Sequence, residues 1–220
     1  MSTDLNYDTV QEFLIDIVPM REPEMQRMEK YARENNFPII GPAAGYNCYQ
    51  IARMIAAKSI FEMGSGYGYS TAWFARAVQE TCAEERTNGV GVVHYTVWDE
   101  KLSKMAAGHL SRLGFDGLIE YHTAEAVETL RNTPGQFDLI FNDIDKEGYP
   151  DSLPVIKDKL RSGGVLIVDN ILWSGRVFDQ EEKSNSTESI REFTRLITSD
   201  SDWITSITPI RDGLIIAYKK

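Results

Sequence analysis

The chain has 220 residues, a formal net charge of −10 and 42% hydrophobic residues. This length suits one domain with a sizeable core, expected over residues 1–220, and is short for two. The acidic net charge disfavours a protein that binds duplex nucleic acid or long RNA, because such proteins neutralise the phosphates with clusters of Lys and Arg. No apolar run is long enough to span a membrane, and the first residues lack the basic and apolar parts of a signal peptide. A cytoplasmic protein is therefore the default expectation.

Two amphipathic helices are expected in residues 1–36. Apolar side chains recur at helical spacing from residue 5 to Pro19, and a second stripe follows Pro23, a residue common at the first position of a helix. Three roles fit this segment: packing on the core, covering a substrate pocket, or contacting a partner subunit. Another helix is expected over Ala43–Ala57.

The stretch Ser59–Ala77 is the one around which the rest of the chain is organised. An apolar strand, Ile60–Met63, leads through three glycines into a helix with apolar residues at helical spacing. Glycines let the backbone approach a ligand, and the free N–H groups at the helix start then face that ligand. The spacing G-x-G-x-G differs from the dinucleotide fingerprint, and no phosphate-loop G-K-[ST] follows. The carboxylate of Glu62 suits a ligand with cationic or hydroxyl groups.

Strands and helices then alternate. Strands are expected over Val92–Val97, Leu118–His122, Phe137–Asn142 and Val165–Val168, and helices over Asp99–Leu113, Ala124–Arg131 and Tyr149–Leu160. Residues 81–91 are interpreted as a polar surface connection, and 162–164 as a turn. Such alternation is typical of right-handed βαβ units on a parallel sheet.

The end of the chain has a different pattern. A helix expected over Ser189–Ile197 is followed by strands over Trp203–Ile210 and Leu214–Tyr218. The pair Asp212-Gly213 between these strands indicates a hairpin. The prediction is an α/β fold, in which a mostly parallel seven-stranded sheet closes with an antiparallel C-terminal strand and carries helices on both faces.

Polar residues follow two of the expected strands. Because ligands of open parallel sheets bind beyond the carboxyl ends of the strands, Asp143, Asp169 and Asn170 are candidate ligands. Two carboxylates and an amide oxygen suit Mg²⁺ or Ca²⁺ rather than zinc, although a single Asp at a strand end more often caps a helix. The two cysteines and three histidines form no sequence motif, and they are interpreted as structural.

Three segments carry a resemblance to a known family. They are F-E-M-G-S-G-Y-G-Y-S (61–70), F-D-L-I-F-N-D-I-D-K-E-G-Y (137–149) and G-G-V-L-I-V-D-N-I-L-W-S-G-R-V (163–177). With them, the chain from Phe37 to Lys220 resembles the cation-dependent O-methyltransferases of the caffeoyl-CoA and catechol type, which use S-adenosylmethionine (SAM). The resemblance implies a Rossmann-like methyltransferase fold and a homodimer.

The resemblance also implies residue roles. It places cofactor contacts on Ile40, Glu62, Gly64, Ser65, Ser70, Ala126 and Asp143, and metal ligands on Asp143, Asp169 and Asn170. Lys146 matches the catalytic lysine of the family. Lys146, Tyr149 and Trp173 would line the pocket of a small phenolic substrate.

One position departs from the pattern. Most Rossmann-type proteins carry an acidic residue for the ribose hydroxyls at the end of the second strand, where this chain has Val97. Asp99 is the candidate substitute, and Trp98 is a candidate to stack on the adenine.

The implied chemistry is physically consistent. A hydroxyl with a pKa of about 10 is mostly neutral at neutral pH. A divalent cation, Mg²⁺ or alternatively Ca²⁺ or Mn²⁺, stabilises its deprotonated form. Like charge pushes a neighbouring lysine toward its neutral form, so that the lysine can take the proton.

Three alternatives stay open. The first is a methyltransferase that acts on a modified tRNA base, against which the acidic net charge argues. The second is a non-catalytic ligand-binding relative, suggested by Val97. The third is a nicotinamide dehydrogenase, which the glycine spacing disfavours.

Overall fold

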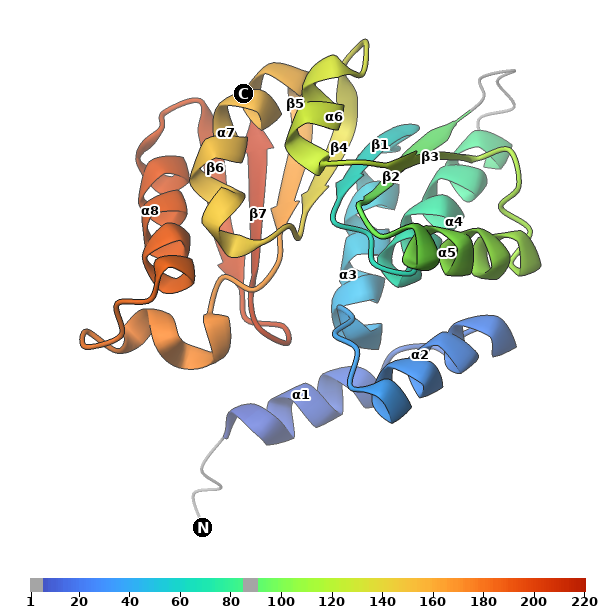
Figure 1. Cartoon of the computed structure of the whole chain (residues 1–220), viewed down its shortest axis with the longest axis horizontal. Coiled ribbons are helices and arrows are strands. Elements are labelled where there is room, and N and C mark those ends of the chain that lie inside the picture. Colours follow the sequence, from blue (N-terminus) through green and yellow to red (C-terminus); the bar gives the residue numbers. More distant parts are fainter. Residues whose placement is uncertain (1–5, 85–90) are drawn as a thin grey trace.

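The computed structural model describes residues 6–84 and 91–220. Seven strands form one sheet in the order β3-β2-β1-β4-β5-β7-β6 (Figure 1). They are β1 (Ser59–Met63), β2 (Val92–Val97), β3 (Ile119–Thr123), β4 (Phe137–Asn142), β5 (Leu160–Val168), β6 (Trp203–Thr208) and β7 (Leu214–Lys219). The first five strands run parallel, and β7 pairs antiparallel with both β5 and β6. The predicted α/β fold is confirmed.

Helices cover both faces of the sheet. They are α1 (Tyr7–Asp16), α2 (Pro23–Asn35), α3 (Gly41–Met54), α4 (Tyr69–Glu84), α5 (Glu100–Arg112), α6 (Ala126–Asn132), α7 (Tyr149–Lys159) and α8 (Asn185–Ser199), with short 3₁₀ helices η1 (Lys146–Gly148) and η2 (Trp173–Phe178). One core lies between the sheet and α2 to α5, and the other between the sheet and α6 to α8 (Figure 1). Ile60 belongs to the first core and its neighbour Phe61 to the second. Because both faces are buried, the central strands are continuous apolar runs.

One predicted turn was wrong. Residues 162–164 lie inside β5, which begins at Leu160. Its pairing with β4 shifts register between Phe137 and Leu139, and Gly163 has a φ of 75°. An irregularity of this kind absorbs extra residues and lets the strand continue. The predicted connection 81–91 and the start of the first predicted helix lie partly outside the described residues.

The helix α1 is held against the hairpin between β6 and β7. The side chain of Gln11 donates to the carbonyl of Pro209 at 3.1 Å and accepts from the backbone N–H of Arg211 at 2.6 Å. The Tyr7 hydroxyl donates to the Arg211 carbonyl. None of the residues of α1 is buried, and Phe13 is 63% exposed. In Figure 1, α1 and α2 lie beyond the end of the sheet towards which β4 and β5 point.

Among residues 6–84 and 91–220, none of the helices combines the length and the hydropathy that crossing a bilayer requires.

Candidate active site

The glycine turn between β1 and α4 is fixed by its neighbours on both sides. The N–H of Ser65 donates to the carbonyl of Thr96 at 2.8 Å, and the N–H of Gly64 donates to the Thr96 hydroxyl at 3.2 Å. Gly64 has a φ of 86°, and a Cβ there would lie 2.4 Å from the carbonyl oxygen of Asp143. Only glycine fits this close approach of two backbones. The turn is thereby placed where the carboxyl ends of β1, β2 and β4 meet.

Glu62 lies directly beneath this turn and is fully buried. One carboxylate oxygen, Oε2, accepts from the Thr71 hydroxyl, whereas Oε1 has no partner in hydrogen-bond geometry among the described residues, although the Ser65 and Ser70 hydroxyls also act on this carboxylate. Burial raises the pKa of Glu62. A buried acceptor without a partner is costly, so this oxygen suits a ligand that brings a hydroxyl or a cationic donor.

A cavity of about 680 Å³ opens above the turn. Ten of the predicted site residues line it: Ile40, Gly64, Ser65, Ser70, Trp98, Ala126, Asp143, Lys146, Asn170 and Trp173. Glu62, Tyr149 and Asp169 do not line the cavity and are almost completely buried beneath it. The structure therefore brings residues from the ends of several strands to one place.

Lys146 stands at the centre of a hydrogen-bonded group. Its Nζ lies 2.8 Å from Asp143 Oδ1, 2.8 Å from the Tyr149 hydroxyl and 3.2 Å from the Ile144 carbonyl. The Tyr149 hydroxyl donates in turn to the carbonyl of Asp169 at 2.9 Å. The ammonium is also 5.9 Å from the centre of the Trp173 ring. These contacts hold a mostly buried amine at the cavity wall.

Asp169 is 1% exposed and carries an unpaired oxygen. Its Oδ2 accepts from the Arg211 guanidinium at 2.8 Å, whereas its Oδ1 has no hydrogen-bond partner. Burial, and then the nearby charge of Asp143, raise the pKa of Asp169 to about 7, against the opposing effect of Arg211. A cation close to both carboxylates would offset this repulsion.

Asn170 supplies a third oxygen next to these carboxylates. It has a φ of 60°, and its Nδ2 donates to Asp212 Oδ2 at 3.2 Å. That bond uses the amide nitrogen and leaves the amide oxygen available. The unpaired buried oxygen of Asp169, the carboxylate of Asp143 and this amide form an all-oxygen donor set, which fits a hard divalent cation.

Asp99, the predicted substitute for the ribose-binding acid, caps a helix in the structure. Asp99 does not line the cavity, and its carboxylate caps α5 by accepting from the Leu102 N–H at 2.9 Å. Trp98 is 77% exposed and lies on the cavity wall. Glu125 also lines the cavity, but its carboxylate caps α6 through the N–H groups of Val127 and Glu128.

Arg211 lines the cavity and pairs with Asp169, and the sequence patterns did not indicate it as a candidate site residue. It lines the cavity from the hairpin between β6 and β7, and it adopts a φ of 53°. In the sequence, the neighbouring pair Asp212-Gly213 indicates only a turn. The available signal was a cationic residue, Arg211, directly before the Asp212-Gly213 pair of the hairpin.

Comparison with known proteins gives a consistent result. The model of a family described as O-methyltransferase matches residues 23–220. A catechol O-methyltransferase from Niastella koreensis is 24% identical over 225 residues, which cover 97% of this chain and 98% of that protein.

Solved structures share the fold over nearly the whole chain. An O-methyltransferase from Bacillus cereus in complex with SAH superposes with a TM-score of 0.84 at 24% identity, covering 98% of this chain and all of that one. The O-methyltransferase TomG from Streptomyces achromogenes, in complex with SAM, gives a TM-score of 0.80 at 24% identity and covers 96% of each chain.

Proposed function

The chain belongs to the O-methyltransferase family, and on that premise we propose that it moves a methyl group from SAM to a hydroxyl of a catechol-like or caffeoyl-type phenol, aided by a divalent cation. The observation that carries the proposal is the cavity floor. There, two buried carboxylate oxygens have no hydrogen-bond partner among the described residues, Oε1 of Glu62 and Oδ1 of Asp169. Glu62 lies two residues before Gly64 and Asp169 directly precedes Asn170, and both Gly64 and Asn170 line the cavity. The Glu62 oxygen suits the cofactor and the Asp169 oxygen suits the cation.

SAM is proposed to bind over the glycine turn. Glu62, Gly64, Ser65 and Ser70 surround the position expected for its methionine part, and Ile40, Trp98 and Ala126 line the adjoining wall. The Glu62 carboxylate would receive the ammonium group, which supplies the donor that Oε1 lacks. Bound SAM supplies an electrophilic methyl group on a sulfonium. Asp99 is not part of this proposal, because its carboxylate caps α5.

The cation is proposed to be held by Asp143, Asp169 and Asn170. Its chemistry is to favour the deprotonated form of a substrate hydroxyl and to fix its position. Asp143 also accepts from Lys146. A cation on that carboxylate competes with the ammonium and repels it, which favours the neutral amine.

Lys146 is the proposed proton acceptor. The neutral amine would take the proton of the substrate hydroxyl at Nζ, which would leave the oxygen as the nucleophile for the methyl group that bound SAM supplies. The Tyr149 hydroxyl and the Ile144 carbonyl keep Nζ in place. Trp173 lines the cavity, and its buried indole Nε1 has no hydrogen-bond partner among the described residues, which supports a role for this side chain next to the substrate.

The N-terminal helices are proposed to cover the substrate side of this cavity. The hydrogen bonds of α1 reach Arg211, which lines the cavity. The exposed apolar residues Phe13 on α1 and Ile17 directly after it make this segment the proposed contact of a homodimer. Light scattering of the full chain, compared with an Ile17→Glu variant, tests that contact.

The direct test is methyl transfer from labelled SAM to a panel of a catechol, a caffeoyl-type phenol and a monophenol. We expect transfer to the vicinal oxygens with Mg²⁺, none in EDTA, and recovery when Mg²⁺ is added in excess. Full activity in EDTA would contradict the cation. Label on tRNA but on no phenol would favour the tRNA alternative, and absence of SAM binding would favour the non-catalytic one.

A further inference from the structure

Two of the three histidines come together on the sheet, although sequence analysis interpreted them as structural. His94 lies on β2 and is paired in register with Glu120 on β3, whereas His122 lies two residues further along β3. In a strand, residues two apart point to the same face, so Glu120 and His122 lie on one side of β3. The pairing of two parallel strands thus gathers two imidazoles and a carboxylate.

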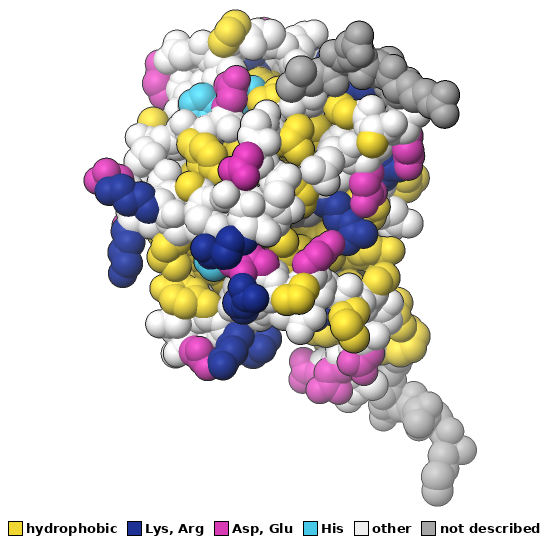
Figure 2. All heavy atoms as spheres, turned by 90° about the vertical axis from the view of Figure 1, so that its right-hand side faces the viewer, with side chains coloured by type: hydrophobic (Ala, Val, Ile, Leu, Met, Phe, Trp, Pro, Cys, Tyr) yellow, Lys and Arg dark blue, Asp and Glu magenta, His cyan; other side chains and the backbone are white. Residues whose placement is uncertain are grey.

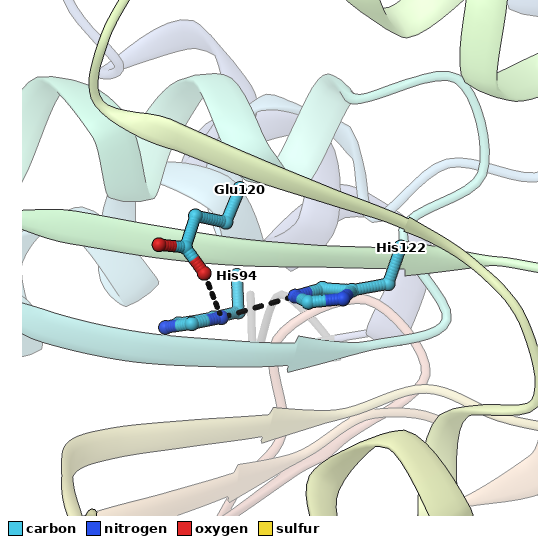
Figure 3. A group of neighbouring side chains, drawn as sticks. All are labelled: His94, Glu120 and His122. Carbon is cyan, nitrogen blue, oxygen red and sulfur yellow. Dashed lines mark hydrogen bonds and ion pairs between the residues drawn. The ribbon is translucent and has the colours of Figure 1, made fainter. Parts of the chain in front are cut away.

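The three side chains point towards one another (Figure 3). His94 Nδ1 lies 3.1 Å from His122 Nε2 and 3.2 Å from Glu120 Oε2. One ligand atom from each residue lies within 4.8 Å of the other two. Ligand atoms around a tetrahedral Zn²⁺ are separated by about 3.4 Å, from metal–ligand bonds of about 2.1 Å. Small side-chain rotations therefore bring these atoms to zinc distances.

The cluster combines a rigid inner ligand with accessible outer ones. His94 is 7% exposed, stacks on the Phe61 ring at 5.6 Å and meets the edge of Phe137 at 5.3 Å. The Glu120 side chain is 61% exposed, and His122 is half-buried. Histidine and acidic side chains lie together at the surface near the top of Figure 2. An ion can reach this site without any opening of the core.

We propose that His94, Glu120 and His122 bind a late transition metal of the Zn²⁺ type, at a site separate from the cation site of the cavity. Two imidazole nitrogens and one carboxylate suit zinc, cobalt or nickel, whereas Mg²⁺ prefers oxygen ligands alone. Three protein ligands leave one position for water. The metal would link β3 to β2 through their side chains and so stabilise β3, which is an edge strand of the sheet.

The test uses the full chain without an affinity tag, stripped of metal and kept in excess Mg²⁺ so that the cavity oxygens are occupied. Calorimetry with Zn²⁺ should show one site per chain, and Co²⁺ should give the visible absorption of a tetrahedral nitrogen and oxygen site. His122→Gln and Glu120→Gln should each weaken Zn²⁺ binding by at least about tenfold. Glu100→Gln is the matched control, since Glu100 is also an exposed acid (75%, against 61% for Glu120) and its ion pair is with Lys104 on its own helix.

Thermal unfolding gives a second measurement. Zn²⁺ should raise the Tm of the wild type and leave that of His122→Gln unchanged, because only a ligand that binds the folded state stabilises it. Unaltered Zn²⁺ affinity in both variants would overturn the proposal. Loss of Zn²⁺ binding in Asp169→Asn, with binding retained in His122→Gln, would also overturn it by assigning the ion to the cavity. If His122→Gln does not fold, Glu120→Gln still tests the proposal, because the Glu120 side chain is exposed and its substitution should not disturb the core. The result does not depend on the proposed function, because no methyl transfer is measured.

Discussion

The two parts of the cavity are built in different ways. The proposed cofactor part is centred on one contiguous stretch, Glu62 to Ser70, whose backbone is tied to β2 through Thr96, and Ile40, Trp98 and Ala126 complete its wall. The substrate part gathers Asp143, Asp169 and Arg211 from three distant segments. The first is shaped by glycines and backbone hydrogen bonds, the second by opposing charges.

This difference has an electrostatic consequence. The proposed cofactor part holds one buried carboxylate, that of Glu62, whose Oε1 atom has no hydrogen-bond donor among the described residues. The proposed substrate part holds two neighbouring carboxylates, of which Asp143 pairs with the Lys146 ammonium and Asp169 pairs through one oxygen with the Arg211 guanidinium. The Oδ1 atom of Asp169 has no hydrogen-bond partner among the described residues, so the substrate part keeps one oxygen for a cation, whereas the proposed cofactor part needs a ligand that brings a donor to Glu62.

The largest effect is expected for Asp169→Asn. Removing this charge should lower Mg²⁺-dependent methyl transfer roughly a thousandfold, equivalent to about 4 kcal/mol of barrier. SAM affinity should change by less than about twofold, because Asp169 follows β5, two strands away from the glycine turn that follows β1. Initial rates and calorimetric SAM titrations measure the two quantities.

Asp145→Asn is the matched control for this variant. Asp145 is an exposed carboxylate on the wall of the same cavity, and its removal should alter the rate by only a few-fold. Equal losses in both variants would show that the net charge of the cavity, rather than a cation site at Asp169, governs the reaction.

The next effect is expected for Glu62→Gln, in the cofactor part. Losing a charged hydrogen bond worth about 1.5–3 kcal/mol should weaken SAM affinity about tenfold to a hundredfold. The neutral amide should leave the Tm unchanged or higher, because burial already raises the pKa of Glu62 and penalises its charge. A lower Tm with unchanged SAM affinity would instead make Glu62 a structural residue.

The same contrast explains what the sequence could predict. The glycine turn, the strands and the acids at their ends were all predicted, because they depend on periodicity and on short spacing. Asp99 is the predicted ribose ligand, and in the structure one oxygen of its carboxylate accepts from the nearby N–H of Leu102 and caps a helix, a role that the sequence pattern did not indicate. The pair of Asp169 and Arg211 is separated by 42 residues in sequence, and that of His94 and His122 by 28. Such pairs depend on strand order and register, which single-sequence patterns do not specify.

Gly64→Ala tests how closely the two parts of the cavity approach each other. The new Cβ would lie 2.4 Å from the carbonyl oxygen of Asp143, at a φ of 86°. We expect a loss of about 2–3 kcal/mol in the free energy of unfolding, measured in urea. Gly114→Ala is the control, because Gly114 has a similar φ of 79° and no atom within 4 Å of its Cβ; it should lose only about 1 kcal/mol. Equal losses would mean that backbone conformation alone, and not the contact with β4, requires glycine at position 64.

The smallest effect concerns pH in the metal-free protein. Because the folded-state pKa of Asp169, about 7, exceeds the ordinary value of 3.8, the folded state holds this proton more tightly than the unfolded chain. The resulting stability is complete below the ordinary pKa and is lost as the pH rises towards 7. We expect the free energy of unfolding to fall by about 1 kcal/mol per pH unit between pH 5 and 7.

Asp169→Asn should remove this pH-dependent component, and Mg²⁺ should restore the stability of the wild type at pH 8, because the cation binds the ionised carboxylate. A wild-type slope equal to that of the variant would show that Arg211 already neutralises Asp169, which would leave the substrate part of the cavity as well balanced as the cofactor part.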